Sequence, residues 1–268
     1  MPDMAGSMLP MIEVRAVPAF RDNYIWLLCD AGPERHTAIV DPGDAVPVLR
    51  ALEADRLTPV AILITHHHAD HTGGIPELLE HYALPVFGPA TEAIPRLTHP
   101  LREGDRITLR SLPTFTVMDV PGHTAGHIAY AGAGRLFCGD TLFAGGCGRL
   151  FEGSAAQLYA SLQRIASLPD DTWIYCAHEY TLANLNFAAV VEPGNPALQA
   201  RLEHARMLRQ AGTATVPTEL GVEKQTNPFL RCAAPAVMAA AARHAGAERA
   251  AGLQTFAELR RWKDHWHG

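Results

Sequence analysis

The sequence predicts an α/β protein that ends in a smaller helical domain, and two observations support this class. Up to about residue 180, short runs rich in β-branched and aromatic residues alternate with segments of helical spacing. Beyond that point the chain is rich in Ala, Leu, Arg and Glu, with Pro or Gly between the helical stretches. We therefore expect a layered α/β domain over residues 1–179 and a helical domain over residues 180–268.

The strands expected in the first domain are short apolar runs closed by turn residues. In chain order they cover residues 25–30, 37–44, 59–65, 84–89, 115–123, 128–140 and 172–180. Helices are expected between several of these strands, over residues 46–54, 75–81 and 155–167. In the second domain the helical stretches cover residues 195–212, 234–246 and 255–266.

The net charge and the cysteine pattern exclude several kinds of binding partner and structural site. With 22 Lys and Arg against 28 Asp and Glu, the formal net charge is −6, so neither nucleic acid nor an anionic membrane is an expected partner. The 5 cysteines are scattered without a CxxC pair, which indicates neither a disulfide framework nor a thiolate zinc site. No apolar run has the length of a signal peptide or a membrane span, so we expect a cytoplasmic protein, and a monomer.

The stretch "THHHADHTGG", residues 65–74, is a dense set of metal-binding side chains. It follows an apolar strand, and in extended chain His66 and His68 point the same way, so they can hold one ion. Asp70 and His71 lie where a helix is expected to begin and face another direction, which favours a second ion beside the first. His67 points away from its neighbours and is expected to bind no metal.

Three further donors follow later strand runs, namely His123, Asp140 and His178. Loops beyond strand ends are where α/β proteins usually place ligands and catalytic residues. Imidazole and carboxylate donors suit zinc, iron or manganese, and the residues do not decide among these metals. For His127 and Asp41 two roles stay open, because a residue that orients a metal ligand and an ordinary core or turn residue look alike in sequence.

The series T-H-x-H-x-D-H, a PGHT histidine, a GD aspartate and a late strand-end histidine resembles the ligand series of the metallo-β-lactamase superfamily. The resemblance implies an αββα sandwich that holds two divalent metal ions, with zinc favoured and iron or manganese possible. It implies the following ligands: His66, His68 and His123 for the first ion, Asp70, His71 and His178 for the second, and Asp140 between the two. Two such ions can activate water and polarise a carbonyl group, so hydrolysis is the expected chemistry.

Two longer stretches, residues 138–162 and 177–188, resemble the glyoxalase II family, the hydroxyacylglutathione hydrolases. The C-terminal "KQTNPFLR" and "ELRRWKD" extend the resemblance over nearly the whole chain and imply that residues 180–268 are a glutathione-binding domain. The residues that the resemblance assigns to glutathione binding are Arg149, Phe151, Tyr180, Arg260 and Lys263. Phe151 departs from the family pattern, in which a tyrosine often stands at this position.

The resemblance therefore implies a binuclear-metal thioesterase that hydrolyses S-(2-hydroxyacyl)glutathione, such as S-D-lactoylglutathione, to glutathione and a 2-hydroxy acid such as D-lactate. This reaction is the second step of methylglyoxal detoxification, and Asp70 is the expected catalytic residue because it can orient the attacking water. Three alternative functions are disfavoured, and one of them is a nuclease, which the acidic charge balance and the absence of a basic exosite argue against. A mono-iron glutathione persulfide dioxygenase is disfavoured by the HEYT block and the C-terminal Arg-x-x-Lys, and a non-catalytic scaffold is disfavoured because every ligand of the series is present.

Overall fold

Two six-stranded sheets form the centre of the protein, of which the computed structural model describes residues 12–248 and 250–266. The first sheet has the order β1 (Ile12–Ala19), β2 (Asn23–Asp30), β3 (His36–Val40), β4 (Thr58–Leu63), β5 (Val86–Pro89), β6 (His99–Leu101). The second has the order β14 (Thr218–Glu219), β13 (Trp173–Cys176), β10 (Arg135–Gly139), β9 (Ile128–Gly132), β8 (Phe115–Asp119), β7 (Arg106–Ile107). Residues 1–11, where a signal peptide would lie and none is expected, are outside the described residues.

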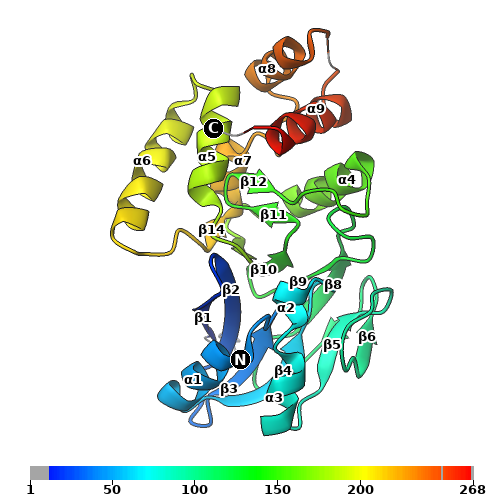
Figure 1. Ribbon diagram of the computed structural model, residues 1–268, viewed down its shortest axis with the longest axis vertical. Coiled ribbons are helices and arrows are strands. Elements are labelled where there is room, and N and C mark those ends of the chain that lie inside the picture. Colours follow the sequence, from blue (N-terminus) through cyan, green and yellow to red (C-terminus); the bar gives the residue numbers. More distant parts are fainter. Residues whose placement is uncertain (1–11, 249, 267–268) are drawn as a thin grey trace, which may run out of the picture.

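The helices lie on the outer faces of the sheets and at one end of the molecule (Figure 1). In chain order they are α1 (Ala45–Asp55), α2 (Ala69–Thr72), α3 (Ile75–His81), α4 (Ala155–Ala166), α5 (Thr181–Val191), α6 (Pro196–Gln210), α7 (Leu220–Thr226), α8 (Pro235–Ala245) and α9 (Leu253–Asp264). A short hairpin of β11 (Leu142–Phe143) and β12 (Gly146–Cys147) follows β10.

The first sheet separates two layers of the hydrophobic core, and the side chains of β2 alternate between them. Ile25 and Leu27 pack in a cluster with buried residues of α1 and α3. Trp26 and Leu28 point to the opposite face and pack in a second cluster, which contains residues of the second sheet and of α4. The order of layers is helices, sheet, sheet, helix, so the expected αββα sandwich is confirmed, with further helices from the C-terminal part of the chain.

Local capping signals explain where the helices near the site begin. Asp44 accepts a hydrogen bond from the backbone N–H of Val46 at the start of α1. Ser154 and Gln157 form a reciprocal capping box at the start of α4. The three helices expected in the α/β domain therefore agree with α1, α3 and α4 to within a residue or two.

The sequence analysis did not predict the short strands β6, β7, β11, β12 and β14, and it differs from the structure in two longer segments. The run 128–140 is not one strand but the hairpin of β9 and β10, because Ala133 and Gly134 both take a positive φ, 49° and 70°, and reverse the chain. Strand β1 was not predicted, although Ile12, Glu13, Val14 and Arg15 alternate between apolar and charged residues. It forms because its backbone pairs with β2 along the full length of both strands.

The C-terminal part of the chain is joined to the sandwich rather than separate from it. Its strand β14 pairs with β13 and so adds a strand to the second sheet. The sequence predicted only helices in this part of the chain. Phe229, Phe256 and Leu259 belong to the same buried cluster as the interior of the sandwich. Helices α5, α6, α8 and α9 gather in the upper half of Figure 1. The C-terminal helices are therefore placed against the sandwich by a shared core.

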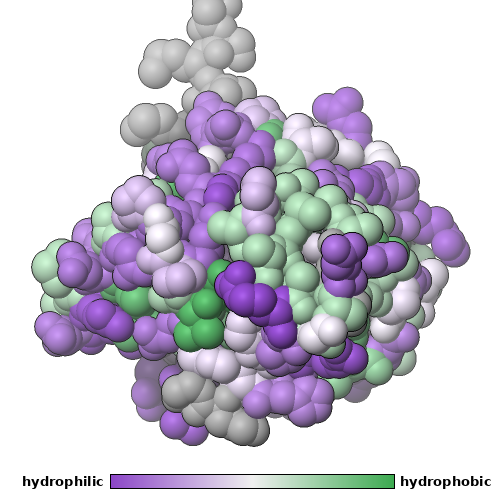
Figure 2. Space-filling view, turned by 90° about the horizontal axis from the view of Figure 1, so that it is seen from above, coloured by the Kyte–Doolittle hydropathy of each residue, from purple (hydrophilic) through white to green (hydrophobic). Residues whose placement is uncertain are grey.

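The face at this end of the molecule mixes strongly hydrophilic residues with a moderately hydrophobic area (Figure 2). The alanine-rich sequence of α8, which lies at this end in Figure 1, is consistent with that intermediate hydropathy. Among the described residues, none of the helices has the length and apolar character that crossing a membrane requires.

Candidate metal centre and substrate pocket

Four strands of the two sheets deliver the expected metal ligands to one place. The loop after β4 carries His66 and His68, and α2 follows directly with Asp70 and His71. The loop after β8 carries His123, whereas Asp140 follows β10 and His178 follows β13. Because these strands lie in two facing sheets, their ends meet although the residues are far apart in the chain.

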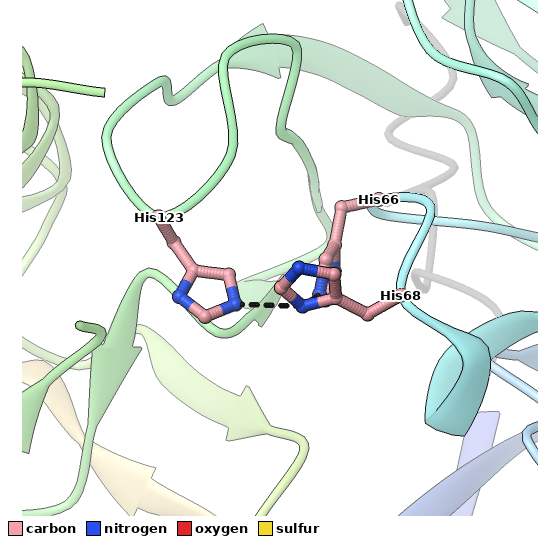
Figure 3. Close-up of side chains that lie close together, drawn as sticks. All are labelled: His66, His68 and His123. Atoms are coloured by element: carbon pink, nitrogen blue, oxygen red, sulfur yellow. Dashed lines mark hydrogen bonds between the residues drawn. The ribbon is translucent and has the colours of Figure 1, made fainter. Parts of the chain in front are cut away.

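The imidazoles expected at the first ion point toward one another. The Nδ1 atom of His68 lies 3.1 Å from the Nε2 atom of His66 and 3.1 Å from the Nε2 atom of His123. Figure 3 shows this convergence, with His66 and His68 on one loop and His123 on another. These nitrogens lie close enough to hold one ion in common. Burial lowers the pKa of His66 well below its usual value, which keeps this ring in the neutral form that binds metals.

The donors expected at the second ion form a neighbouring group. The Nε2 atom of His178 lies 3.4 Å from the Oδ2 atom of Asp70, and the Nε2 atom of His71 lies 3.6 Å from the same oxygen. The ring of His71 also lies beside that of His66, with 4.1 Å between centroids. The two groups are therefore adjacent, as the position of α2 at the end of the His66 loop requires.

Asp140 lies between the two groups and presents a different oxygen to each. Its Oδ2 atom lies 3.4 Å from the Nε2 atom of His123. Its Oδ1 atom lies 3.5 Å from the Nε2 atom of His71 and 3.3 Å from that of His178. Although burial opposes ionisation of Asp140, the facing imidazoles of His71 and His178 hold the pKa of its carboxyl well below its usual value. The carboxylate can therefore contact an ion on either side.

Outer hydrogen bonds fix the orientation of several ligand rings. The Nδ1 atom of His178 lies 3.0 Å from Asp22, and the Nδ1 atom of His123 lies 2.9 Å from the carbonyl oxygen of Arg149. In both rings this contact leaves Nε2 directed at the centre, which is the arrangement that orients a metal-bound imidazole. The sequence did not indicate Asp22, because its turn between β1 and β2 is remote in the chain from His178.

The two residues whose roles stayed open both lie beside the centre. Asp41 accepts hydrogen bonds from the backbone and the hydroxyl group of Thr65, each 2.8 Å long, and its carboxylate lies 3.1 Å from the Nδ1 atom of His71. His127 is fully buried, stacks on His66, and accepts a hydrogen bond from the backbone N–H of Asp140. Asp41 therefore helps to orient His71, and His127 helps to orient His66 and Asp140.

The donor set fits metal ions, because two buried polar atoms at its centre have no hydrogen-bond partner among the described residues; the third unpartnered atom of the set, Nδ1 of His71, faces Asp41. Among the described residues nothing makes a hydrogen bond with the Nε2 atom of His71 or the Oδ1 atom of Asp140, and both atoms are inaccessible to solvent. Unpaired buried polar atoms are costly and rare in folded proteins. A cation between them would satisfy both atoms.

His67 takes no part in this group, in line with its expected role. Its ring turns to two carboxylates instead, with Nδ1 lying 3.0 Å from Glu92 and Nε2 lying 3.3 Å from Glu152. These three side chains are close enough to resemble a further metal site. However, Glu92 already accepts hydrogen bonds from the backbone of His67 and of Gly126, so the group is a hydrogen-bonded contact between loops.

A cavity of about 460 Å³ opens beside the metal centre, and all the residues expected to bind glutathione line it. Its wall consists of His123, Asp140, Phe143, Cys147, Arg149, Phe151, Tyr180, Ala183, Asn184, Arg260, Lys263 and Trp266. The sequence did not indicate Asn184 or Trp266 as part of this wall. Trp266 lies 4.5 Å from the ammonium group of Lys263 and so helps to place it.

The cations of the cavity come from both parts of the chain. Arg260 on α9 is buried and donates to the carbonyl oxygen of Cys147, at 2.9 Å, and to Asp264. Its Nε–H is also buried and makes no hydrogen bond with any described residue. Lys263 donates to the carbonyl oxygen of Ala183. Together with the exposed Arg149 they make one end of the cavity positive in a protein of net charge −6.

The C-terminal residues also hold the β11–β12 hairpin, which precedes Arg149. Asn227 donates to the carbonyl oxygens of Phe143 and Gly146, at 3.3 and 2.9 Å. Glu223 is fully buried, pairs with Arg201 and accepts a hydrogen bond from the backbone of Gly145. The "KQTNPFLR" stretch is therefore a support for the wall of the cavity.

Comparison with known proteins agrees with this arrangement. Residues 19–178 match the sequence model of the metallo-beta-lactamase superfamily, and residues 179–266 match that of the hydroxyacylglutathione hydrolase C-terminus. Two curated proteins named hydroxyacylglutathione hydrolase are similar over almost their whole length. That of Alkalilimnicola ehrlichii is 56% identical and covers 95% of this chain and 99% of its own, and that of Nitrosomonas eutropha is 53% identical and covers 96% and 100%.

A solved structure of TTHA1623 in a di-iron-bound form is also similar. It has 28% sequence identity and a TM-score of 0.57, and the match covers 82% of this chain and 99% of that one. The fold and the match over residues 19–178 show that the chain belongs to the metallo-β-lactamase superfamily. Within the superfamily, the C-terminal match and the identity to the curated relatives show that it belongs to the hydroxyacylglutathione hydrolase family.

We predict that His67→Ala leaves two metal ions per chain, whereas His68→Ala loses the ion of the first site. The reason is that the His68 ring lies among the other expected ligands and the His67 ring faces Glu92 and Glu152. Elemental analysis of each purified variant beside the unsubstituted protein measures the stoichiometry. Loss of an ion from the His67 variant, or two ions in the His68 variant, would contradict the assignment of these two neighbours.

Proposed function

We propose that this chain is a hydroxyacylglutathione hydrolase, a thioesterase that cleaves S-(2-hydroxyacyl)glutathione to glutathione and a 2-hydroxy acid. The observation that carries the proposal is the single cavity that joins the metal-ligand group to a cluster of cations. The curated relatives with 53% and 56% identity, and the C-terminal family match, support the same activity. They favour it over a persulfide dioxygenase. S-D-lactoylglutathione is the proposed substrate, as in the second step of methylglyoxal detoxification.

We propose two divalent ions, with zinc as the favoured metal, held by His66, His68 and His123 on one side and by Asp70, His71 and His178 on the other, with Asp140 between them. When bound, such ions supply an activated water and polarise the thioester carbonyl group. The similarity of this chain to the structure of TTHA1623 in a di-iron-bound form supports a binuclear centre. Imidazole and carboxylate donors also suit manganese, so elemental analysis is the measurement that identifies the metal.

The cations of the cavity suit the two carboxylates of glutathione. Arg260, Lys263 and Arg149 all line the cavity and place positive charge at the same end. Charge-assisted hydrogen bonds of this kind are stronger than neutral ones. The Tyr180 ring stacks on His178, and burial raises the pKa of its phenol, so the hydroxyl group stays a neutral donor near the thioester. Phe151 is exposed at the cavity wall and offers apolar contact in place of a tyrosine hydroxyl.

In the reaction, the oxygen of water bonds to the acyl carbon, the C–S bond breaks, and glutathione leaves as the thiolate. Asp70 is the proposed catalytic residue, because its carboxylate is partly exposed at the centre and can accept a hydrogen bond from the attacking water. The side-chain amide of Asn23 donates to the Oδ2 atom of Asp70 at 3.0 Å and limits the rotation of this carboxylate. Asn23 thus gives Asp70 a defined orientation.

We also propose a cytoplasmic monomer that acts on a small molecule, without a nucleic acid or a membrane as partner. The net charge of −6 supports the absence of a polyanionic partner. Light scattering on the purified chain measures its mass, and a mass of two chains would contradict the monomer.

The proposed function predicts that the protein hydrolyses glutathione thioesters faster than other thioesters. The purified, metal-loaded protein is expected to hydrolyse S-D-lactoylglutathione with a kcat/KM at least about a hundredfold above that for a lactoyl thioester of a small uncharged thiol, because only glutathione reaches the cations. Thiol release measures both rates. Equal rates would leave a thioesterase without glutathione specificity, and oxygen consumption with glutathione persulfide would instead identify the dioxygenase.

Asp70→Asn tests the proposed role of Asp70 in catalysis. The amide keeps the size of the carboxylate but loses its charge, so we expect kcat to fall about a hundredfold, within the range of a lost general base or orienting group. Metal content is measured on the same sample, because Asp70 is also an expected ligand. Two bound ions together with an unchanged kcat would rule out the catalytic role.

The pKa of Lys263 predicts how substrate binding depends on pH. Burial, together with the neighbouring Arg260 and Arg149, lowers the pKa of its ammonium group to about 8. The group is charged below that pH and loses its charge above it, so we expect KM for the glutathione thioester to rise about tenfold from pH 7 to pH 9.5. In Lys263→Arg the guanidinium stays protonated, and the rise should be much smaller. The same rise in both proteins would show that another group titrates.

A further inference from the structure

Glu92 is a buried carboxylate to which the proposed function assigns no role. It lies in the loop between β5 and β6, and its side chain is 3% exposed. Acidic side chains are rarely this buried unless they are paired or fully hydrogen-bonded. The contacts of this carboxylate therefore indicate what keeps it there.

Each oxygen of Glu92 contacts a different loop of the metal centre. The Oε2 atom accepts a hydrogen bond from the backbone N–H of His67 at 2.7 Å and lies 3.0 Å from the Nδ1 atom of the same residue. The Oε1 atom accepts hydrogen bonds from the backbone N–H of Gly126, at 2.9 Å, and from the hydroxyl group of Thr124. His67 separates two of the expected ligands, and Thr124 directly follows a third.

These contacts cross the division between the two sheets. The loop of His66 and His68 leaves β4 in the first sheet, whereas the loop of His123 leaves β8 in the second. Figure 3 shows that the three imidazoles meet from these separate loops. A first metal site built in this way depends on how the loops are held relative to each other. Besides Glu92, a backbone hydrogen bond of 2.9 Å from Ile128 to Thr65 links the same two segments.

The surroundings of Glu92 exclude the simpler interpretation that it is a cation ligand with His67 and Glu152. Both of its oxygens already accept two donors from the protein, so little capacity remains for an ion. A Cβ atom at Gly126 would lie 2.6 Å from the Cγ atom of Glu92, which shows how closely the loop packs on this side chain. Glu92 is thus an acceptor for loop donors.

We propose that Glu92 is a positioning residue of the first metal site: its carboxylate joins the His67 backbone to the Thr124–Gly126 segment and so holds His66, His68 and His123 in the arrangement that binds the ion. The inference rests on the proposed metal centre, and it goes beyond that centre because Glu92 touches none of the expected ligands. Partners that orient metal ligands typically contribute 10-fold to 100-fold to metal affinity.

The test compares Glu92→Gln and Glu92→Ala with the unsubstituted protein in a zinc titration against a chromophoric chelator, which resolves two dissociation constants. Glutamine keeps the size of Glu92 but replaces one acceptor oxygen by an NH₂ group, so one of the two loops meets a donor in place of an acceptor. We expect one of the two dissociation constants to rise about 10-fold to 100-fold while the other changes less than about threefold. Thermal unfolding after chelation checks that each variant folds.

Glu152→Gln is the matched control, because Glu152 also contacts the His67 ring and accepts a hydrogen bond from the backbone of Ala125, yet its side chain is 40% exposed. We expect less than about a threefold change in either constant for this variant. Unchanged dissociation constants in folded Glu92→Gln, or an equal change in Glu152→Gln, would overturn the role of Glu92. Either result would leave the proposed metal centre and function standing. An unsubstituted protein that binds fewer than two ions would overturn the binuclear centre and this inference with it.

Discussion

The position of the Asp140 carboxylate between two groups of imidazoles is the constraint on which the rest of the site depends. Its two oxygens face opposite sides, toward His123 on one and toward His71 and His178 on the other. A carboxylate this buried is stable only where positive charge surrounds it, and polar atoms in its vicinity make no hydrogen bond with any residue that the structure describes. The folded protein thus holds a preformed place for cations rather than one that a ligand must create.

The two parts of the chain make different contributions to the same cavity. The α/β sandwich supplies the metal-ligand group, because the ends of β4, β8, β10 and β13 meet where its two sheets face each other. The C-terminal helices supply Arg260 and Lys263 and hold the β11–β12 hairpin that leads to Arg149. A protein of net charge −6 can therefore attract an anionic substrate, since the positive groups are concentrated at one end of the cavity. A shared core joins the two parts of the chain.

Residues outside the ligand set determine how the ligands are oriented. Asp22 and Asn23 reach the centre from the β1–β2 turn, and Asp41 reaches it from the end of β3. Glu92 reaches it from the loop after β5. Each of these side chains lies at or near the end of a strand of the first sheet, so the ligands are supported by residues that the sheet places. The number of such contacts explains how loops from two separate sheets can form one site.

The sequence by itself determined the fold class, the family and the division of the donors into two groups. Apolar strand runs and the donors that follow them are local features, and the spacing of His66, His68, Asp70 and His71 depends only on backbone geometry. The C-terminal motifs likewise pointed to a glutathione thioester before any contact was known. The tertiary structure alone decided which remote residues support the ligands, that residues 128–140 form a hairpin, and that β1 is a strand. Asp22, Asn23 and Glu92 have no local signal, because a hydrogen bond between distant loops depends on how the two sheets pack.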